Sequence, residues 1–251
     1  MVPSGATVPR LVRRPTYARL LAVLKNRLLT APDTWERHLI VADLLGSPSE
    51  VVDVGGLPRQ LAGFLPDSRV LAVNVHEPAD LIVPLDSLPF ADGAFEAATS
   101  LDVLEHVNPA ARADFIAEFV RVARRRSVLC CPLGTPQHRA AEEEVQSWYR
   151  SITGEDHPWL VEHLVNGLPR LDELRDAYAR LPGRTRFLFH GDFRKVNQQF
   201  RRIVLARYRH RPGDVASYLG SRVRYRPVRV LTPEPERHSN RVFAVHDGKD
   251  S

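Results

Sequence analysis

The residues with the clearest chemical potential lie at the end of a short apolar run, where Asp53 is followed by Gly55 and Gly56. Glycine lets the backbone take a positive φ angle and approach a ligand closely. A carboxylate at the same turn can accept hydrogen bonds or pair with an ammonium group. Ligands of open α/β sheets bind beyond the carboxyl ends of the strands, so this turn is a candidate ligand site. The fragment alone leaves an ordinary strand-to-loop turn open as the alternative.

The residues after the turn narrow the class of ligand. A dinucleotide pyrophosphate needs a G-x-G-x-x-G turn, whereas here Leu57-Pro58-Arg59 follows the two glycines. Binding of NAD or FAD is therefore not expected. Cys130 and Cys131 are the only cysteines, and neighbours in a strand point to opposite faces, so they are not expected to pair. This cysteine usage fits a reducing cytosol and predicts a cytoplasmic protein.

Short apolar runs bounded by turn residues predict the strands that hold the candidate turn. They span residues 51–54, 70–75, 81–85, 95–101 and 127–131. The link between the second and third runs is too short for a full crossover helix. Asn108 and Pro109 begin a helix as its cap and first residue. Its stripe of Phe115, Ile116, Phe119, Val120 and Ala123 is expected to be buried, and Arg112, Glu118, Arg121 and Arg124 are expected to face water.

Two further regions flank these strands. Before them, residues 16–30 have helical spacing, and a second helix is expected to begin at Asp33, in a capping box with Glu36, and to end before Gly46. After Pro132, helices are predicted over 138–150, 158–181 and 192–210, and strands over 184–190, 223–231 and 241–246. We expect N-terminal helices in 1–50 and one domain over 51–251, in which 133–183 and 191–232 are insertions that form an acceptor cap. No apolar stretch approaches the roughly 18 residues that span a membrane.

Two motifs give the region a recognisable family pattern. The first is Leu88-Pro89-Phe90-Ala91-Asp92-Gly93-Ala94-Phe95-Glu96, and the second is Ser100-Leu101-Asp102-Val103-Leu104-Glu105-His106-Val107. With the turn at Asp53, they resemble the class I methyltransferases that use S-adenosyl-L-methionine (SAM), in particular the small-molecule, methyltransferase type 11-like family. The resemblance covers roughly residues 51–132. It implies a Rossmann-like α/β fold with a seven-stranded, mostly parallel sheet, helices on both faces and helical insertions after the fifth strand.

The resemblance also implies where SAM binds. The expected cofactor-binding residues are Asp53, Val54, Gly55, Gly56, Asn74, Val75, Asp86, Ser87, Leu88, Leu101 and Asp102. This sequence departs from the family pattern at two points. The later glycines of the loop are absent, and Asn74 stands where an acid usually holds the ribose hydroxyls. A neutral amide can still hydrogen-bond a diol, without the added strength of a charged acceptor.

Family members place acceptor residues after the fifth strand, and histidine is a natural proton acceptor near neutral pH. The candidate catalytic residues are His138, His106 and His163. Packing in the core is the alternative for any one of these histidines. A metal site can be drawn on paper from His138, Glu142, His157 and Glu162, but no tight ligand spacing supports it, so no metal is predicted.

These observations predict a SAM-dependent methyltransferase that O-methylates a small-molecule or sugar/glycan hydroxyl. The fourth strand lacks the [DN]-P-P-[YF] sequence of amino-group methyltransferases of nucleobases, and there is no RNA-binding platform of aromatic residues. Nucleic acid is therefore not the expected partner. A homodimer through the N-terminal helices is a further hypothesis.

Two alternatives remain at this point. An RNA methyltransferase could use the basic stretch Arg194, Lys195, Arg201, Arg202, Arg207, Arg209 and Arg211. The formal net charge is +5, but Lys25, Lys195 and Lys249 are the only lysines, and such an arginine bias is also typical of a GC-rich coding sequence. A non-catalytic binding protein on the same fold is the second alternative, because of the missing glycines and Asn74.

Overall fold

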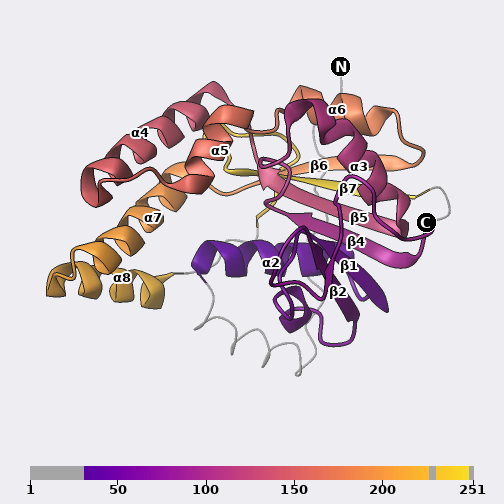
Figure 1. Ribbon diagram of the computed structural model, residues 1–251, viewed down its shortest axis with the longest axis horizontal. Helices are drawn as coiled ribbons and strands as arrows, with labels where there is room; N and C mark the ends of the chain where they lie inside the picture. The colour runs from indigo at the N-terminus through magenta and orange to yellow at the C-terminus, as the bar shows by residue number, and fades with distance from the viewer. Residues whose placement is uncertain (1–30, 226–229, 249–251) are drawn as a thin grey trace, which may run out of the picture.

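The chain forms a seven-stranded sheet in the computed structural model, which describes residues 31–225 and 230–248 (Figure 1). The strand order is β3-β2-β1-β4-β5-β7-β6. Strand β7 runs antiparallel to both of its neighbours, and the other neighbouring pairs are parallel. The strands are β1 (Glu50–Val54), β2 (Arg69–Asn74), β3 (Leu81–Ile82), β4 (Phe95–Leu101), β5 (Ala123–Pro132), β6 (Arg184–His190) and β7 (Arg241–Asp247). The predicted fold class is confirmed.

Helices cover both faces of this sheet (Figure 1). Helix α2 (Pro32–Leu45) and the 3-10 turn η1 (Leu61–Gly63) bury their apolar side chains on one face. Helices α3 (Arg112–Arg121), which follows the turn η2 (Pro109–Ala111), and α6 (Leu171–Ala179) do so on the other face. Both faces of the central strands are thus covered, which explains why those strands are rich in apolar residues.

The remaining helices extend past one end of the sheet, to the left in Figure 1. They are α4 (Pro136–Thr153), α5 (Pro158–Asn166), α7 (Phe193–Tyr208) and α8 (Pro212–Arg224). Helix α4 packs on α5 and α7, and α7 packs on α8. These four helices, called the cap below, fall within the segments expected to be insertions. None of the helices in the described parts of the chain is long and apolar enough to cross a membrane.

The N-terminal boundary of α2 differs from the prediction. The cap residue is Ala31 and Pro32 is the first helical residue, so Asp33 lies inside the first turn and makes no capping bond. Its carboxylate instead contacts Arg37 and Arg241. A proline at the first helical position needs no N–H partner and favours this earlier start. Gly46 ends the helix with a φ of 81°, as expected, and the predicted helix 16–30 lies outside the described residues.

Three other predictions are corrected. The predicted strand 223–231 is not formed in its described part, because α8 continues to Arg224. The third strand contains only Leu81 and Ile82, although the absence of a crossover helix before it is confirmed. Arg112 was expected to face water but is 2% exposed. Its guanidinium is buried because Glu173 and the carbonyls of Val107 and Gly167 supply partners.

Candidate functional site

The glycine loop after β1 is shaped by close packing. Gly55 has a φ of 79°, and its N–H donates to the carbonyl of Val73 over 2.7 Å. A Cβ atom on Gly55 would collide with the side chain of Val103, and one on Gly56 would collide with the carboxylate of Asp53. Side chains are therefore excluded at both positions, and the loop after β4 lies directly against the glycine loop.

Asp53 lies beneath this loop with an unsatisfied carboxylate. The residue is 1% exposed, and its Oδ1 atom is buried without a hydrogen-bond partner. Burial raises the pKa of Asp53 to about 7, although the charge of Arg37 opposes the rise. A buried carboxylate oxygen without a partner is costly. A ligand with a cationic hydrogen-bond donor near Asp53 would therefore reduce the free-energy cost of this buried carboxylate.

Asn74, at the end of β2, is turned toward the glycine loop. Its Nδ2 atom donates to the carbonyls of Gly55 and Gly56 over 3.2 and 3.4 Å. Its Oδ1 atom accepts from the N–H of Val75 over 2.8 Å. Both polar atoms of Asn74 thus brace the loop, while the side chain of Val75 is exposed.

The predicted contacts after β3 are only partly gathered around this loop. Asp86 and Ser87 are exposed, and Leu88 is buried. The N–H of Leu88 donates to Glu118 over 2.7 Å, and its carbonyl accepts from Arg121 over 3.1 Å. The backbone of Leu88 is therefore occupied by α3, and a role for these three residues in cofactor binding stays a prediction.

Asp102 belongs to an ion-pair network that the sequence did not indicate. It follows Leu101 at the end of β4 with a φ of 54°, and its carboxylate contacts Arg37 over 2.7 Å and Arg241. Arg241 also contacts Asp33 over 2.6 Å. Burial alone would raise the pKa of Asp33, but the charges of Arg241 and Arg37 hold it below its ordinary value. The network joins α2, β4 and β7, so the structure gives Asp102 partners within the protein.

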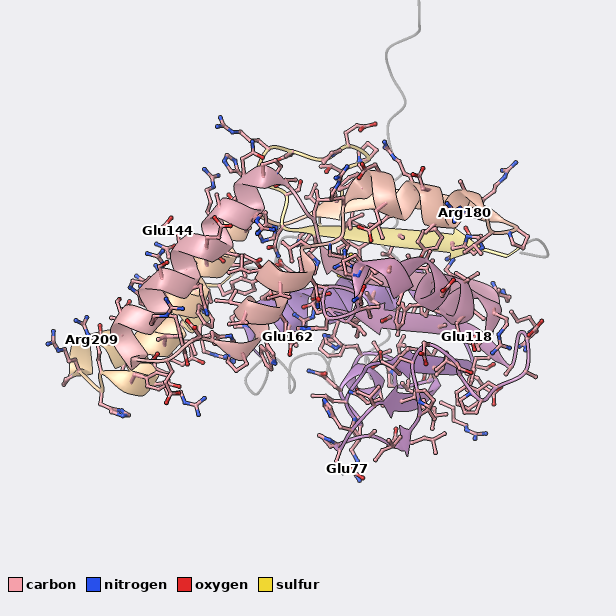
Figure 2. All side chains as sticks on the ribbon, turned by 45° about the horizontal axis from the view of Figure 1, so that its top comes forward. Glu77, Glu118, Glu144, Glu162, Arg180 and Arg209 are labelled. Carbon is pink, nitrogen blue, oxygen red and sulfur yellow. The ribbon has the colours of Figure 1, made fainter. Side chains whose placement is uncertain are left out.

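A second cluster forms where the loop after β4 meets the cap. Nδ1 of His106 donates to Glu162 of α5 over 2.6 Å, and Nδ1 of His163 donates to Glu142 of α4 over 2.9 Å. The two imidazole rings have their centroids 5.1 Å apart. Glu162 and His163 are neighbours on α5, and both belong to this cluster. Glu162 contacts His106 of the loop after β4, whereas His163 contacts Glu142 of α4. Figure 2 labels Glu162 on α5.

Glu105 completes this cluster, called the histidine–carboxylate cluster below, as its most buried acid. Glu105 is 1% exposed, and its Oε2 atom has no hydrogen-bond partner. Burial, reinforced by the charge of Asp102, raises the pKa of Glu105 to about 8. Burial by itself would lower the pKa of His163, but the Glu142 carboxylate raises it above the ordinary value.

His138, the third candidate catalytic residue, has a different environment. It is 3% exposed, stacks on Phe193 with ring centroids 4.7 Å apart, and donates from Nδ1 to the carbonyl of Leu133. Burial lowers its pKa, which favours the neutral form of the ring. The structure thus brings His106 and His163 together and places His138 against the aromatic packing of α7. The catalytic role of all three stays a prediction.

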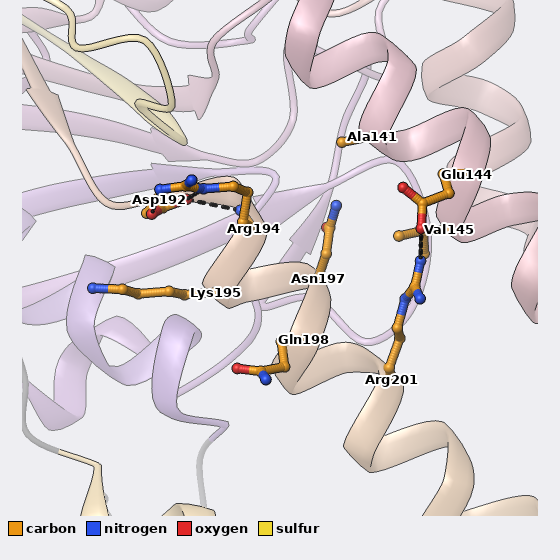
Figure 3. Close-up of a pocket in the computed structure, with 9 residues that line it drawn as sticks. All are labelled: Ala141, Glu144, Val145, Asp192, Arg194, Lys195, Asn197, Gln198 and Arg201. Atoms are coloured by element: carbon orange, nitrogen blue, oxygen red, sulfur yellow. Dashed lines mark hydrogen bonds and ion pairs between the residues drawn. The ribbon is translucent and has the colours of Figure 1, made fainter.

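The basic stretch of α7 lines a separate pocket of about 540 Å³ between α4 and α7. Figure 3 shows that the two arginines lining this pocket form ion pairs: Arg194 contacts Asp192 over 2.7 Å, and Arg201 contacts Glu144 over 2.6 Å. This pairing reduces the positive charge that the pocket could offer to a nucleic acid.

Comparison with known proteins identifies the central part of the chain. Residues 61–131 match the profile of the family described as "Methyltransferase domain". This segment, which runs from η1 into β5, is therefore similar to a methyltransferase domain. No curated protein matches the sequence significantly.

Solved structures agree with this methyltransferase fold. One is a protein assigned as a sarcosine dimethylglycine methyltransferase from Galdieria sulphuraria, with a TM-score of 0.52 and 12% identity over 90% of this chain and 86% of that chain. Another is a geranyl diphosphate methyltransferase in complex with SAM, with a TM-score of 0.50 and 14% identity over 94% and 93% of the two chains. At these identities the likeness concerns the fold.

The glycine loop, which precedes the matched segment in the chain, has features that fit SAM. The unpartnered Oδ1 of Asp53 can accept a hydrogen bond from the ammonium group of SAM, and the side-chain-free loop lets the cofactor approach the backbone. Asn74 stands where an acid was expected to hold the ribose hydroxyls, and its amide instead hydrogen-bonds the backbone of Gly55 and Val75.

Sequence reasoning missed the residues whose partners are distant in the chain. Arg37 and Arg241 carry no motif, and Glu142 was named from the sequence without its partner His163. Their signal is tertiary: each arginine is matched to a partly buried aspartate, and Glu142 to a histidine from another helix. Spacing alone could not reveal these pairs.

Proposed function

We propose that this methyltransferase transfers the methyl group of SAM to a hydroxyl oxygen of a small-molecule or sugar/glycan acceptor. The observation that carries the proposal is the histidine–carboxylate cluster at the end of β4. It lies between the loop packed against the glycine loop and the cap helices α4 and α5. An acceptor there would sit beside the cofactor and against groups that hydrogen-bond hydroxyls.

SAM supplies an electrophilic methyl group on a sulfonium when it is bound. In this proposal the chain's own residues do the rest. Asp53 and the glycine loop hold the cofactor, and the cap covers the acceptor and excludes water. Transfer to an alcohol also releases a proton, and the cluster offers imidazole and carboxylate groups within one hydrogen-bonded arrangement to receive it.

The two alternatives receive less support. The arginines of α7 that line the pocket are paired with Asp192 and Glu144, which weakens the case for RNA as the acceptor. The hydrogen bonds of Asn74 to the glycine loop would favour a non-catalytic protein only if they prevented SAM from binding. The unpartnered Oδ1 atom of Asp53 beneath the loop instead supports SAM binding.

The test is an acceptor screen with SAM that measures formation of its demethylated product. We expect turnover with a hydroxyl-bearing metabolite or sugar, and a product whose new methyl group is on oxygen by NMR. The His163→Ala variant should lower turnover by about 10²- to 10⁴-fold, the usual contribution of a residue that handles the proton. The Val165→Ala variant changes a 79% exposed side chain on the same helix and should retain wild-type turnover.

Three results would contradict the proposal. One is methylation of carbon or nitrogen in the preferred acceptor. Another is preferential methylation of RNA, with the steep salt dependence of phosphate contacts. The third is tight SAM binding without turnover across the panel, which would favour the non-catalytic alternative.

A further inference from the structure

The histidine–carboxylate cluster contains buried polar atoms that no protein group satisfies. In addition to Oε2 of Glu105, Nε2 of His163 is buried without a hydrogen-bond partner. Leaving such atoms unpaired in a protein interior costs free energy, and a bound ligand that pairs with them would remove this cost. The two residues lie in one cluster, since each has a ligand atom within 4.8 Å of the other's.

The hydrogen bonds of the two histidines point to the kind of ligand. Each ring uses Nδ1 to contact a carboxylate, Glu162 for His106 and Glu142 for His163, which leaves Nε2 as the nitrogen that faces a ligand. A histidine that binds a metal through one nitrogen typically donates from the other to a carboxylate, which fixes the tautomer and the ring orientation. Two such pairs side by side form an outer shell suited to a metal ion.

The positions of the candidate ligands agree with this. Glu105, His106 and His163 each offer one ligand atom, and these atoms all lie within 4.8 Å of one another. Ligand atoms about 2.1 Å from a tetrahedral metal are about 3.4 Å apart, so small side-chain rotations would complete the site. We propose that Glu105, His106 and His163 bind a divalent first-row transition metal such as Zn²⁺, as a two-histidine, one-carboxylate set.

This ligand set has a consequence for the chemistry. Three protein ligands leave a coordination position open, as in catalytic rather than structural zinc sites. The side chain of His106 is 31% exposed, so the site is accessible from solvent. An acceptor hydroxyl bound at the open position would lose its proton more readily, because the metal stabilises the alkoxide. Only this consequence rests on the proposed methyl transfer; the binding of the ion does not.

Metal binding is tested directly on the full-length protein after treatment with a chelator and its removal. Titration with Co²⁺, followed by visible absorption, should show one equivalent bound in a site of low symmetry, and Zn²⁺ should displace it. The Glu105→Gln and His163→Ala variants should each weaken binding at least tenfold, in line with the loss of a ligand. The His157→Gln variant, which changes a histidine of the same cap outside the ligand set, should bind like the wild type.

Folding is controlled for in the same samples. Glutamine replaces a buried glutamate of equal size, so circular dichroism of Glu105→Gln should match the wild type, and His106→Gln provides a second, partly exposed ligand variant. Zn²⁺ should raise the melting temperature of the wild type by several degrees and that of Glu105→Gln by less. Equal Co²⁺ binding by the wild type and all three ligand variants, or no binding by the wild type, would overturn the proposal. Neither result depends on SAM binding or turnover.

Discussion

Asp53 shows at the residue scale how one buried side chain couples stability to ligand binding. Its pKa is raised to about 7 from an ordinary value of 3.8, mainly by burial. The folded protein therefore binds a proton more tightly than the unfolded chain, so the free energy of unfolding falls as pH rises between these two values. The same carboxylate is the group that would contact the ammonium of SAM.

The Asp53→Asn variant should separate these two effects. At pH 8 it should be more stable than the wild type by a few kcal/mol at most, because an uncharged amide avoids the cost of a buried charge. At pH 4.5 the gain should largely disappear. Affinity for SAM at pH 8 should fall at least tenfold, since a charge-assisted bond is lost. Urea unfolding at both pH values and calorimetric titration with SAM measure the two quantities, and unchanged SAM affinity would remove Asp53 from the cofactor site.

His38 should produce the opposite pH dependence. Burial, reinforced by the charge of Arg37, lowers its pKa from 6.5 to about 4, while its Nδ1–H donates to the carbonyl of Thr34. The unfolded chain binds a proton below pH 6.5 that the folded protein does not, so stability should be lost as pH falls from 6.5 to 4. The His38→Gln variant should show a smaller loss over this range in urea unfolding. Because Asp53 changes stability in the opposite sense, the informative quantity is the difference between variant and wild type.

The network of Asp33, Arg37, Asp102 and Arg241 acts at the scale of elements. It ties the first turn of α2 to the end of β4 and the start of β7, three segments that are distant in sequence. The guanidinium of Arg241 is 7% exposed, so its charge is stabilised mainly by the two aspartates. The loop that begins at Asp102 and carries Glu105 and His106 is thereby fixed to the sheet.

Removal of Arg241 should therefore be costly. The Arg241→Met variant keeps the volume of the side chain but leaves Asp33 and Asp102 with Arg37 as their only cation in the network. We expect a loss of about 3–5 kcal/mol, as is usual when one partner of a buried ion pair is removed. The matched control is Arg139→Met, because Arg139 pairs with Glu143 on the surface of α4 with 57% of its side chain exposed. That change should lower stability by less than about 1 kcal/mol in the same urea unfolding experiment.

Across the whole molecule, the sheet topology gathers the glycine loop, the ion-pair network and the histidine–carboxylate cluster. They follow β1 and β4, which are neighbours in the sheet. Parallel strands bring their carboxyl ends to the same edge, and the cap extends from this edge (Figure 1). In the proposed function, the cofactor would therefore contact the edge of the sheet and the acceptor would contact the cap.

Cofactor binding should be visible in global stability. SAM at about a hundred times its dissociation constant should stabilise the fold by about 2.7 kcal/mol and raise the melting temperature by about 2–4 °C. The demethylated product should give a similar shift, because Asp53 is proposed to contact the ammonium group, which the two molecules share. Differential scanning calorimetry with both ligands measures this, and NAD at the same concentration is the control that should give no shift. A folded protein that responds to neither SAM nor its product would favour the non-catalytic alternative.

The sequence by itself determined the frame of this protein. Strand β4 coincides with the predicted run from Phe95 to Leu101, because its central residues are small or apolar and are buried between the helices on the two faces. The turn at Asp53, Gly55 and Gly56 was equally visible, since close packing excludes other residues there. Only the tertiary structure decided the pairing of polar groups. His106 and Glu162 are separated by 56 residues, and Arg112 is buried because Glu173 is there to neutralise it. Apolar periodicity is a local property of the chain, whereas the partner of a buried charge is chosen by the fold.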